Sequence, residues 1–477
     1  MSSAIPASTD QTTFDLIVIG AGSGGYAAAR TARELGATVA FVDRGPLGGL
    51  CILRGCMPSK TLLATGDLAY EMGHSGELGL AASKAAVDFP FIMERKKEII
   101  QGFTDYRVAG IDTFPTFIGD AHFLSPTELR VGELSLHSEK FVIGTGSVVA
   151  PAAIPGLVDA GFIDSDGALM LDRAPASMIV LGGGYVSTEL GQFYSRIGTK
   201  LTVVIRGSHV LTGEDTDIGE ALTEYLREEG ITIETGAQVT KVSVRADGMK
   251  VVHFTRGGVE EEVAAEEIFY ALGRVPNIEA LGLENAGVDA HAIRGIEIDQ
   301  TLRTTNPSIF AVGDVTGQYL LVHVAIQQGE IAARNAILGT DERIDYSLSK
   351  AHTVFSDPQV GVVGDTEKEL VNAGVAYLKA TYPFNDLGKA ISIGKTKGFV
   401  KMLASPIDGK ILGVQILGSF ASDLIHVPIA AMAFDATVFQ YMKIPHLHPT
   451  LAEILTYPAE EIAELITTAR RPLAAAP

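Results

Sequence analysis

The 477-residue sequence has only two cysteines, a deficit of basic residues and no apolar run long enough to cross a bilayer. Two cysteines are too few for a disulfide framework, and no further sulfur or histidine ligands lie nearby to complete a metal site. The 37 Lys and Arg residues against 57 Asp and Glu residues give a formal charge of -20, which disfavours nucleic acid as a partner. The lack of a long apolar run disfavours a membrane protein.

The start of the chain also lacks the features of a targeting segment. The first thirteen residues, MSSAIPASTDQTT, have neither the basic start nor the apolar stretch of a signal peptide. We therefore expect a cytoplasmic protein with a disordered N-terminal tail and a second disordered tail at the C-terminal RRPLAAAP. In a reducing cytoplasm, a cysteine pair that can form a disulfide is more typical of transient, catalytic chemistry than of a structural bridge.

The two cysteines, Cys51 and Cys56, lie five residues apart in the stretch GGLCILRGCMPSK. Such a pair can cycle between dithiol and disulfide, which stores two electrons, and it can exchange with another disulfide through thiolate attack. Two buried structural thiols are the alternative. Half of a metal site is disfavoured, because the nearest histidine, His74, has no ligand spacing. The spacing alone does not decide between a redox role and a structural one.

The segment FDLIVIGAGSGGYAAARTARELGATVAFVD has the pattern of a strand, a glycine turn, a helix and a second strand. Gly20, Gly22 and Gly25 are spaced for a tight turn, a close approach of the backbone to a pyrophosphate, and close packing of the helix on the strand. Asp43 ends the second strand, where a carboxylate can bind a ribose hydroxyl. The strand, the helix and the downstream acid together predict a nucleotide site.

A second unit of the same kind lies in SMIVLGGGYVSTELGQFYSRIGTKLTVVIRG, with Gly182, Gly184 and, in place of the third glycine, Ser187. Two units imply two dinucleotides bound by two doubly wound domains. One flavin and one nicotinamide is the economical combination, because a thiol pair needs a hydride source and a relay. Ile205 stands where an acid would contact an unphosphorylated ribose, and Arg206 follows it. This favours NADP, and NAD stays open because a surface Arg is common without a ligand.

Further apolar strands end in glycine or polar turns, in the stretches FVIGTGSVV, IFYALGRVPN and SIFAVGDVTG. Asp314 follows the last of these strands at its carboxyl end, where ligands bind in open α/β sheets, and a plain turn acid is the alternative. From about Ser347, alternating strands and hairpin turns are followed by helical stretches over 421–443 and 451–468. This part of the chain predicts a separate α+β domain.

With these motifs in place, the sequence resembles the flavoprotein disulfide reductases, the class I pyridine nucleotide-disulfide oxidoreductases, from Phe14 to about Ile466. The resemblance implies an α/β fold with two doubly wound dinucleotide-binding domains, one for FAD and one for NAD(P), and a C-terminal α+β dimerisation domain. The expected boundaries are 14–154 and 276–346 for the FAD-binding domain, 155–275 for the NAD(P)-binding domain and 347–468 for the dimerisation domain.

The resemblance also implies which residues bind the cofactors. FAD is expected at Gly20, Gly22, Gly25, Asp43, Thr145, Gly146 and Asp314, and NAD or NADP at Gly182, Gly184 and Arg206, with Tyr185 as a gate over the nicotinamide; Gly273 and Arg274 are further cofactor-binding positions. Lys60 and Glu189 match the pair that lies beside the flavin ring in this family. A cation there would stabilise negative charge arriving at the reduced ring.

The string PHLHPTLAE matches the catalytic motif of the family. By resemblance, His448 is the acid/base and Glu453 its orienting partner, and both enter the active site from the other subunit of a homodimer. An imidazole held by a carboxylate can remove and return a thiol proton near neutral pH. The family also implies that Cys56 faces the flavin and Cys51 faces the disulfide substrate.

Within the family, the resemblance is strongest to dihydrolipoamide dehydrogenase, which shares the doubled histidine HLHPTLAE and His323. The mercuric reductases carry a further cysteine pair that this chain lacks. Leu53 and Arg54 depart from the Asn and the small apolar residue of most relatives, so the substrate stays open between a small dithiol or disulfide and a lipoylated carrier protein.

Other functions stay open at this point. A glutathione reductase-like, NADPH-dependent disulfide reductase shares Tyr185 and Arg30 with this chain. A docking component of a multienzyme complex is an alternative of another class. A hydride-passing transhydrogenase is disfavoured by the intact cysteine pair.

Overall fold

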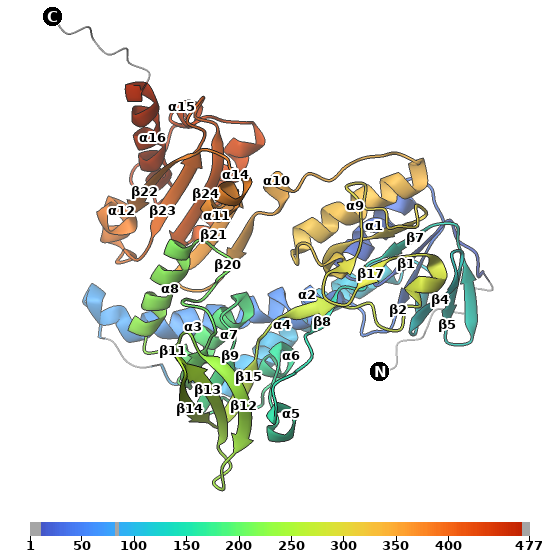
Figure 1. The fold of residues 1–477 in the computed structure, drawn as a ribbon, viewed down its shortest axis with the longest axis horizontal. Coiled ribbons are helices and arrows are strands. Elements are labelled where there is room, and N and C mark those ends of the chain that lie inside the picture. Colours follow the sequence, from blue (N-terminus) through green and yellow to red (C-terminus); the bar gives the residue numbers. More distant parts are fainter. Residues whose placement is uncertain (1–10, 82–84, 470–477) are drawn as a thin grey trace, which may run out of the picture.

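The computed structural model describes residues 11–81 and 85–469, which form three principal sheets with helices packed around them (Figure 1). The expected C-terminal tail and the expected N-terminal tail up to residue 10 lie outside the described residues. The remaining residues of the expected N-terminal tail are not free, since the backbone N–H of His137 donates to the carbonyl of Thr12 at 2.7 Å and Thr13 forms a β-bridge with His137. No described helix combines the length and the apolar character that a membrane span requires.

The first sheet is parallel throughout, in the order β19-β7-β1-β2-β3. Its central strand is apolar on both faces and fully buried, as expected for a parallel strand covered by helices. The strands are β1 (Leu16–Ile19), β2 (Val39–Asp43), β3 (Thr116–Ile118), β7 (Phe141–Ile143) and β19 (Ile309–Ala311), and the packed helices are α1 (Ser23–Glu34) and α9 (Val322–Leu338).

Other helices and strands complete this part of the molecule. They are α2 (Gly49–Arg54), α3 (Cys56–His74), η1 (Ser75–Leu78), α4 (Phe89–Ile111), β4 (Ala121–Ser125), β5 (Glu128–Val131), β6 (Leu134–His137), η2 (Leu283–Ala286), β17 (Ala290–His291), β18 (Gly295–Ile296) and η3 (Gly313–Thr316).

The second sheet is also parallel, in the order β11-β10-β9-β15. Its strands are β9 (Ser177–Leu181), β10 (Lys200–Val204), β11 (Thr232–Glu234) and β15 (Glu267–Tyr270), and the helices of this part of the chain are α5 (Leu157–Ala160), α6 (Ser165–Ala168), α7 (Tyr185–Arg196) and α8 (Thr216–Glu228). The strands β12 (Gln238–Val244), β13 (Lys250–Arg256) and β14 (Val259–Ala265) form a separate antiparallel sheet. The antiparallel pair β8 (Ser147–Val149) and β16 (Arg274–Pro276) lies where the chain leaves the first sheet and returns to it.

The third sheet is antiparallel, in the order β20-β21-β24-β23-β22. Its strands are β20 (His352–Val354), β21 (Gln359–Gly364), β22 (Leu378–Pro383), β23 (Phe399–Ala404) and β24 (Ile411–Gly418). The helices of this part of the chain are α10 (Tyr346–Ser349), α11 (Glu367–Ala373), η4 (Phe384–Asp386), α12 (Gly388–Ser392), α13 (Ala421–Leu424), α14 (His426–Ala433), α15 (Val438–Tyr441), η5 (Ala452–Leu455) and α16 (Thr456–Ala469).

The stretch expected to be helical over 421–443 is helical, and it is divided into three short helices, α13, α14 and α15. Pro428 has no N–H to continue the hydrogen bonding of α13, so a new helix starts around it. Asp435 then adopts a left-handed backbone with φ of 54°, which ends α14. The stretch over 451–468 is helical, as η5 followed by α16.

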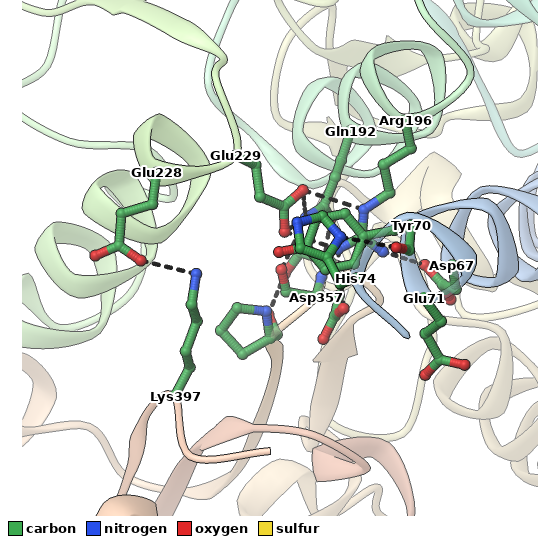
Figure 2. Close-up of polar contacts among 12 residues, drawn as sticks. Asp67, Tyr70, Glu71, His74, Gln192, Arg196, Glu228, Glu229, Asp357 and Lys397 are labelled. Atoms are coloured by element: carbon green, nitrogen blue, oxygen red, sulfur yellow. Dashed lines mark hydrogen bonds and ion pairs between the residues drawn. The ribbon is translucent and has the colours of Figure 1, made fainter. Parts of the chain in front are cut away.

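A buried arginine joins the three sheets (Figure 2). Arg196, at the end of α7, has a side chain only 2% exposed, and its guanidinium contacts Asp67 of α3 at 2.6 Å. It also contacts Glu229, after α8, at 2.7 Å and Asp357, between β20 and β21, at 2.9 Å. The cation lies over the ring of Tyr70 at 4.3 Å. One cation therefore ties the helix that begins at Cys56 to the second and third sheets.

We expect Arg196→Met to lower the apparent free energy of unfolding by about 3 kcal/mol, because the buried Glu229 carboxylate would lose its counter-charge and keep only the hydrogen bonds from Gln192. Arg245→Met is the matched control, since the Arg245–Glu262 pair is about half exposed on both sides; its effect should stay within about 0.5 kcal/mol. Urea denaturation followed by circular dichroism measures both. Equal shifts for the two variants would contradict the role given to Arg196.

Candidate active site

The two cysteines lie at the junction of two helices. Cys51 is in α2 and Cys56 begins α3, and both are free thiols and half-buried. The chain turns back on itself at Gly55, between the two cysteines. A side chain at this position would be crowded, because a Cβ would lie 3.0 Å from the carbonyl oxygen of Leu50 and 3.1 Å from the Cα of Cys51. The close return of the chain brings the two sulfurs together.

The two thiols are chemically unequal. A hydrogen bond from Cys51 lowers the pKa of the Cys56 thiol, and the charge of Lys60 acts in the same direction against the effect of burial. The same hydrogen bond, together with burial, raises the pKa of Cys51. Cys56 is therefore the sulfur that carries negative charge more readily, and Cys51 keeps its proton.

Lys60 and Glu189, which were paired on the sequence, form an ion pair of 2.7 Å between Nζ and Oε2. Lys60 lies one turn after Cys56 on α3, and Glu189 lies on α7 with a side chain only 8% exposed. The second oxygen of Glu189 accepts the backbone N–H of Phe355 at 2.9 Å, and Lys60 lies 4.4 Å from the centre of the Phe355 ring. Helices α3 and α7 meet at this pair with Phe355, which follows β20 in the third domain, the part of the chain that contains the third sheet.

A cavity of about 470 Å³ runs from the first glycine motif to the two cysteines. Nine of the predicted catalytic and cofactor-binding residues line it, namely Gly20, Gly22, Asp43, Cys51, Cys56, Thr145, Gly146, Arg274 and Asp314. Gly25 and Gly273 are not among its lining residues. Gly25 lies behind the turn instead, since a Cβ there would be 1.9 Å from the carbonyl oxygen of Gly20.

The geometry of the first glycine motif fits a dinucleotide. Gly20 has φ of 98°, and a Cβ there would be 2.3 Å from the carbonyl oxygen of Gly144. Gly22 precedes α1 and has open space where its Cβ would be, so a pyrophosphate can approach the helix N-terminus. The Asp43 carboxylate accepts the backbone N–H groups of Ala21 at 2.8 Å and of Gly45 at 2.7 Å, which fixes it beside the turn.

A polar network lines the middle of the cavity. Ser147 donates to Asp314 at 2.7 Å and accepts from Nε of Arg274 at 2.9 Å. Burial raises the pKa of the Asp314 carboxyl and lowers that of the Arg274 guanidinium. Sequence reasoning missed Ser147, although its place directly after the predicted Thr145 and Gly146 is a signal that could have found it.

Arg54, which lies between the two cysteines and departs from the pattern of most relatives, also lines this cavity. Its guanidinium is paired with Asp166 at 3.2 Å, and the side chain is 48% exposed. Asp166, 112 residues further along the chain, was not predicted from the sequence.

The second glycine motif repeats the backbone of the first. Gly182 has φ of 117°, and a Cβ there would be 2.4 Å from the carbonyl oxygen of Ala271, while Gly184 has open space before α7. Ser187, in place of the third glycine, donates its hydroxyl to the Gly184 carbonyl at 2.7 Å. Ile205 is buried beneath this turn, and Arg206 is exposed at its edge.

Tyr185, the first residue of α7, is held by a carboxylate that the sequence did not reveal. Its hydroxyl donates to Glu214 at 2.6 Å, and Nε2 of His352 lies 2.9 Å from the same oxygen. Glu214 lies in the turn before α8 and His352 in β20, 138 residues further along the chain, so no local pattern could have paired them.

His448 and Glu453 form the pair expected from the resemblance. Nδ1 of His448 lies 3.0 Å from Oε2 of Glu453. The imidazole is 79% exposed, whereas the Glu453 side chain is only 12% exposed. A mostly buried carboxylate thus orients an imidazole that is largely exposed on the surface of the chain. His323, by contrast, is bonded to the carbonyl of Ser349 at 2.8 Å.

Comparisons with known proteins agree with this geometry. The chain matches the pyridine nucleotide-disulphide oxidoreductase family over residues 14–329, and the dimerisation domain of that family over residues 350–459. It is 36% identical to dihydrolipoyl dehydrogenase of Bacillus subtilis over 458 residues, which cover 94% of this chain and 96% of the relative. It is 32% identical to mercuric reductase of Bacillus cereus over 443 residues, covering 92% of this chain and 70% of the relative.

Among solved structures, the HOCl-induced flavoprotein disulfide reductase RclA from Escherichia coli superposes with a TM-score of 0.82. It is 26% identical and covers 94% of this chain and 99% of that one. The glycine motifs, the cysteine pair and the matches over both parts of the chain agree. The chain belongs to the pyridine nucleotide-disulphide oxidoreductase family.

Proposed function

We propose that the protein is an FAD-dependent disulfide oxidoreductase of the dihydrolipoyl dehydrogenase type. It would move two electrons between a nicotinamide nucleotide and a dithiol or disulfide substrate through FAD and the Cys51/Cys56 pair. The observation that carries the proposal is that both cysteines line one end of the cavity whose other end is the first glycine motif. The relatives named dihydrolipoyl dehydrogenase, 32–36% identical over most of the chain, support the choice of substrate class.

FAD would be held by the first glycine motif, Asp43, Asp314 and the Ser147–Arg274 network, all on the same cavity. When bound, the flavin supplies the relay between the hydride of the nicotinamide and the electron pair of the thiols. The nicotinamide nucleotide would lie at Gly182 and Gly184, with Tyr185 beside the nicotinamide. The exposed Arg206 and the missing acid at Ile205 favour NADP, with NAD as the alternative.

The unequal thiols give each sulfur a role. In dithiol oxidation, a substrate thiolate attacks Sγ of Cys51, the Cys51–Cys56 bond breaks, and Cys56 leaves as the thiolate that its lowered pKa favours. The second substrate thiol then attacks the mixed disulfide and releases Cys51, which leaves the substrate as a disulfide and the electron pair on the two enzyme sulfurs. His448 of the partner subunit would accept the substrate proton, with Glu453 holding its imidazole.

The substrate is a small dithiol such as dihydrolipoamide or the lipoyl group of a carrier protein. These two are separated by comparing turnover of free dihydrolipoamide with that of a lipoylated domain at equal concentration. Equal rates would count against a dedicated carrier and against a protein whose main role is docking in a larger complex.

We expect Cys51→Ser and Cys56→Ser each to lower dihydrolipoamide turnover by a factor on the order of 10⁴, because each removes one half of the exchangeable pair. Both variants should retain FAD, measured by visible absorbance after purification. Both should also reduce an artificial one-electron acceptor with NADH or NADPH, since that reaction bypasses the thiols. Normal dihydrolipoamide turnover by either variant would contradict the proposal.

A shared active site predicts complementation between two inactive variants. Cys51→Ser and His448→Gln homodimers should each be inactive with dihydrolipoamide. A hybrid dimer with one subunit of each variant has one intact site. Random pairing makes half of the dimers hybrids, so the mixture should recover about a quarter of wild-type activity. Co-expression with two different affinity tags isolates the hybrids. No recovery in purified hybrids would show that His448 serves the cysteines of its own subunit.

A further inference from the structure

The segment from β20 to β21 follows one face of α7 along its whole length. The contacts on α7 come at intervals of three or four residues, so they lie on a single side of the helix. They are Tyr185 with His352 through Glu214, Glu189 with the backbone of Phe355, Gln192 with the backbone of Asp357, and Arg196 with the carboxylate of Asp357. The third domain therefore fixes α7 at each turn, starting at the residue that follows the second glycine motif.

The first of these contacts is a chain of three side chains. The Tyr185 hydroxyl and Nε2 of His352 both bond to Oε1 of Glu214, at 2.6 Å and 2.9 Å. The Tyr185 and His352 rings are stacked, with centres 5.8 Å apart and planes at 30°. Glu214 is almost completely buried, at 2% side-chain exposure, so it needs both partners.

Both ring nitrogens of His352 face hydrogen-bond acceptors. Nδ1 lies 3.1 Å from the carbonyl oxygen of Lys350, and Nε2 faces the Glu214 carboxylate. Only the doubly protonated imidazolium can donate to both. Burial opposes this charge, but the hydrogen bond and charge of Glu214 outweigh burial and raise the pKa of His352.

Three other charged groups, Glu369, Lys350 and Asp365, lie near this site. Glu369 also favours the imidazolium. The Lys350 ammonium is paired with Asp365 at 2.8 Å and with Glu369 at 3.0 Å. The Glu214–His352 ion pair is therefore present at low pH and is lost as pH rises through the raised pKa of His352.

These contacts hold the Tyr185 ring in one place. The ring stacks on His352 of the third domain, and Tyr185 is not among the residues that line the cavity of the two cysteines. A tyrosine at the start of α7 that lost its hydroxyl partner could rotate into the space that a nicotinamide needs. The apparent affinity for the nucleotide would then fall with the fraction of molecules in which that space is clear.

We propose that Glu214 and His352 are positioning residues for the nicotinamide, which hold the Tyr185 ring against the dimerisation domain and keep the nicotinamide pocket open. This inference rests on the proposed function, because that function puts the nicotinamide at the start of α7. His352, which belongs to the dimerisation domain, would then affect nucleotide binding without contacting the nucleotide itself.

The test is equilibrium binding of two probes to the oxidised holoenzyme, followed by the change in flavin absorbance or by calorimetry. One probe is the non-reducing tetrahydronicotinamide analogue of NADH or NADPH, and the other is the matching ADP-ribose, which lacks the nicotinamide. Glu214→Gln and His352→Gln should each weaken the analogue about fivefold and leave ADP-ribose unchanged, since only the nicotinamide competes with the Tyr185 ring. With Tyr185→Ala as background, Glu214→Gln should have no effect.

The pH dependence gives a second readout of the same site. Binding of the analogue to the wild type should weaken as pH rises through the pKa of His352, and His352→Gln should remove this dependence. Equal losses for both probes, no loss in either variant, or an undiminished effect of Glu214→Gln in the Tyr185→Ala background would overturn the inference. A wild-type protein that binds neither probe would instead refute the nicotinamide site, and so the proposed function.

Discussion

The ion pair between Lys60 and Glu189 is the contact on which the arrangement of the site depends. It joins the helix that begins with Cys56 to the helix that begins at the second glycine motif, and Phe355 of the third domain completes it. Removing either partner would leave a poorly solvated charge between three parts of the chain. The hydrogen bond from Cys51 is the main cause that lowers the pKa of Cys56, and the charge of Lys60 adds to it. The pair thus fixes the helix of the cysteines against the helix of the second glycine motif, with its cation near the Cys56 sulfur.

The rest of the site follows from what lies on either side of this pair. The cavity with the first glycine motif, Asp314 and both thiols lies at the start of α3, and the second motif lies at the start of α7. The third domain contributes twice. Within the subunit, its first strand and the turn after it contact α7 from Tyr185 to Arg196. At its far end, Glu453 orients an exposed His448, an arrangement suited to serving a neighbouring subunit.

Features that depend on short spacings were predictable from the sequence. The glycine turns, the cysteine pair and the PHLHPTLAE motif each keep their parts within a few residues, and the Lys60–Glu189 pair came from family resemblance. Contacts between distant segments were not predictable. Glu214 with His352, and Arg54 with Asp166, join residues more than a hundred positions apart. The helical character of 421–443 was predictable from composition, but its division into three helices at Pro428 and at the left-handed Asp435 was not.

The central claim is that electrons from a nicotinamide nucleotide reach the two cysteines. It can be tested by counting thiols, because Cys51 and Cys56 are the only cysteines in the chain. The oxidised holoprotein, denatured and treated with a thiol reagent, should show no free thiol. After anaerobic addition of one equivalent of NADH or NADPH per subunit, whichever the protein accepts, it should show two. Oxidation of the nucleotide without any gain in thiols would contradict the account.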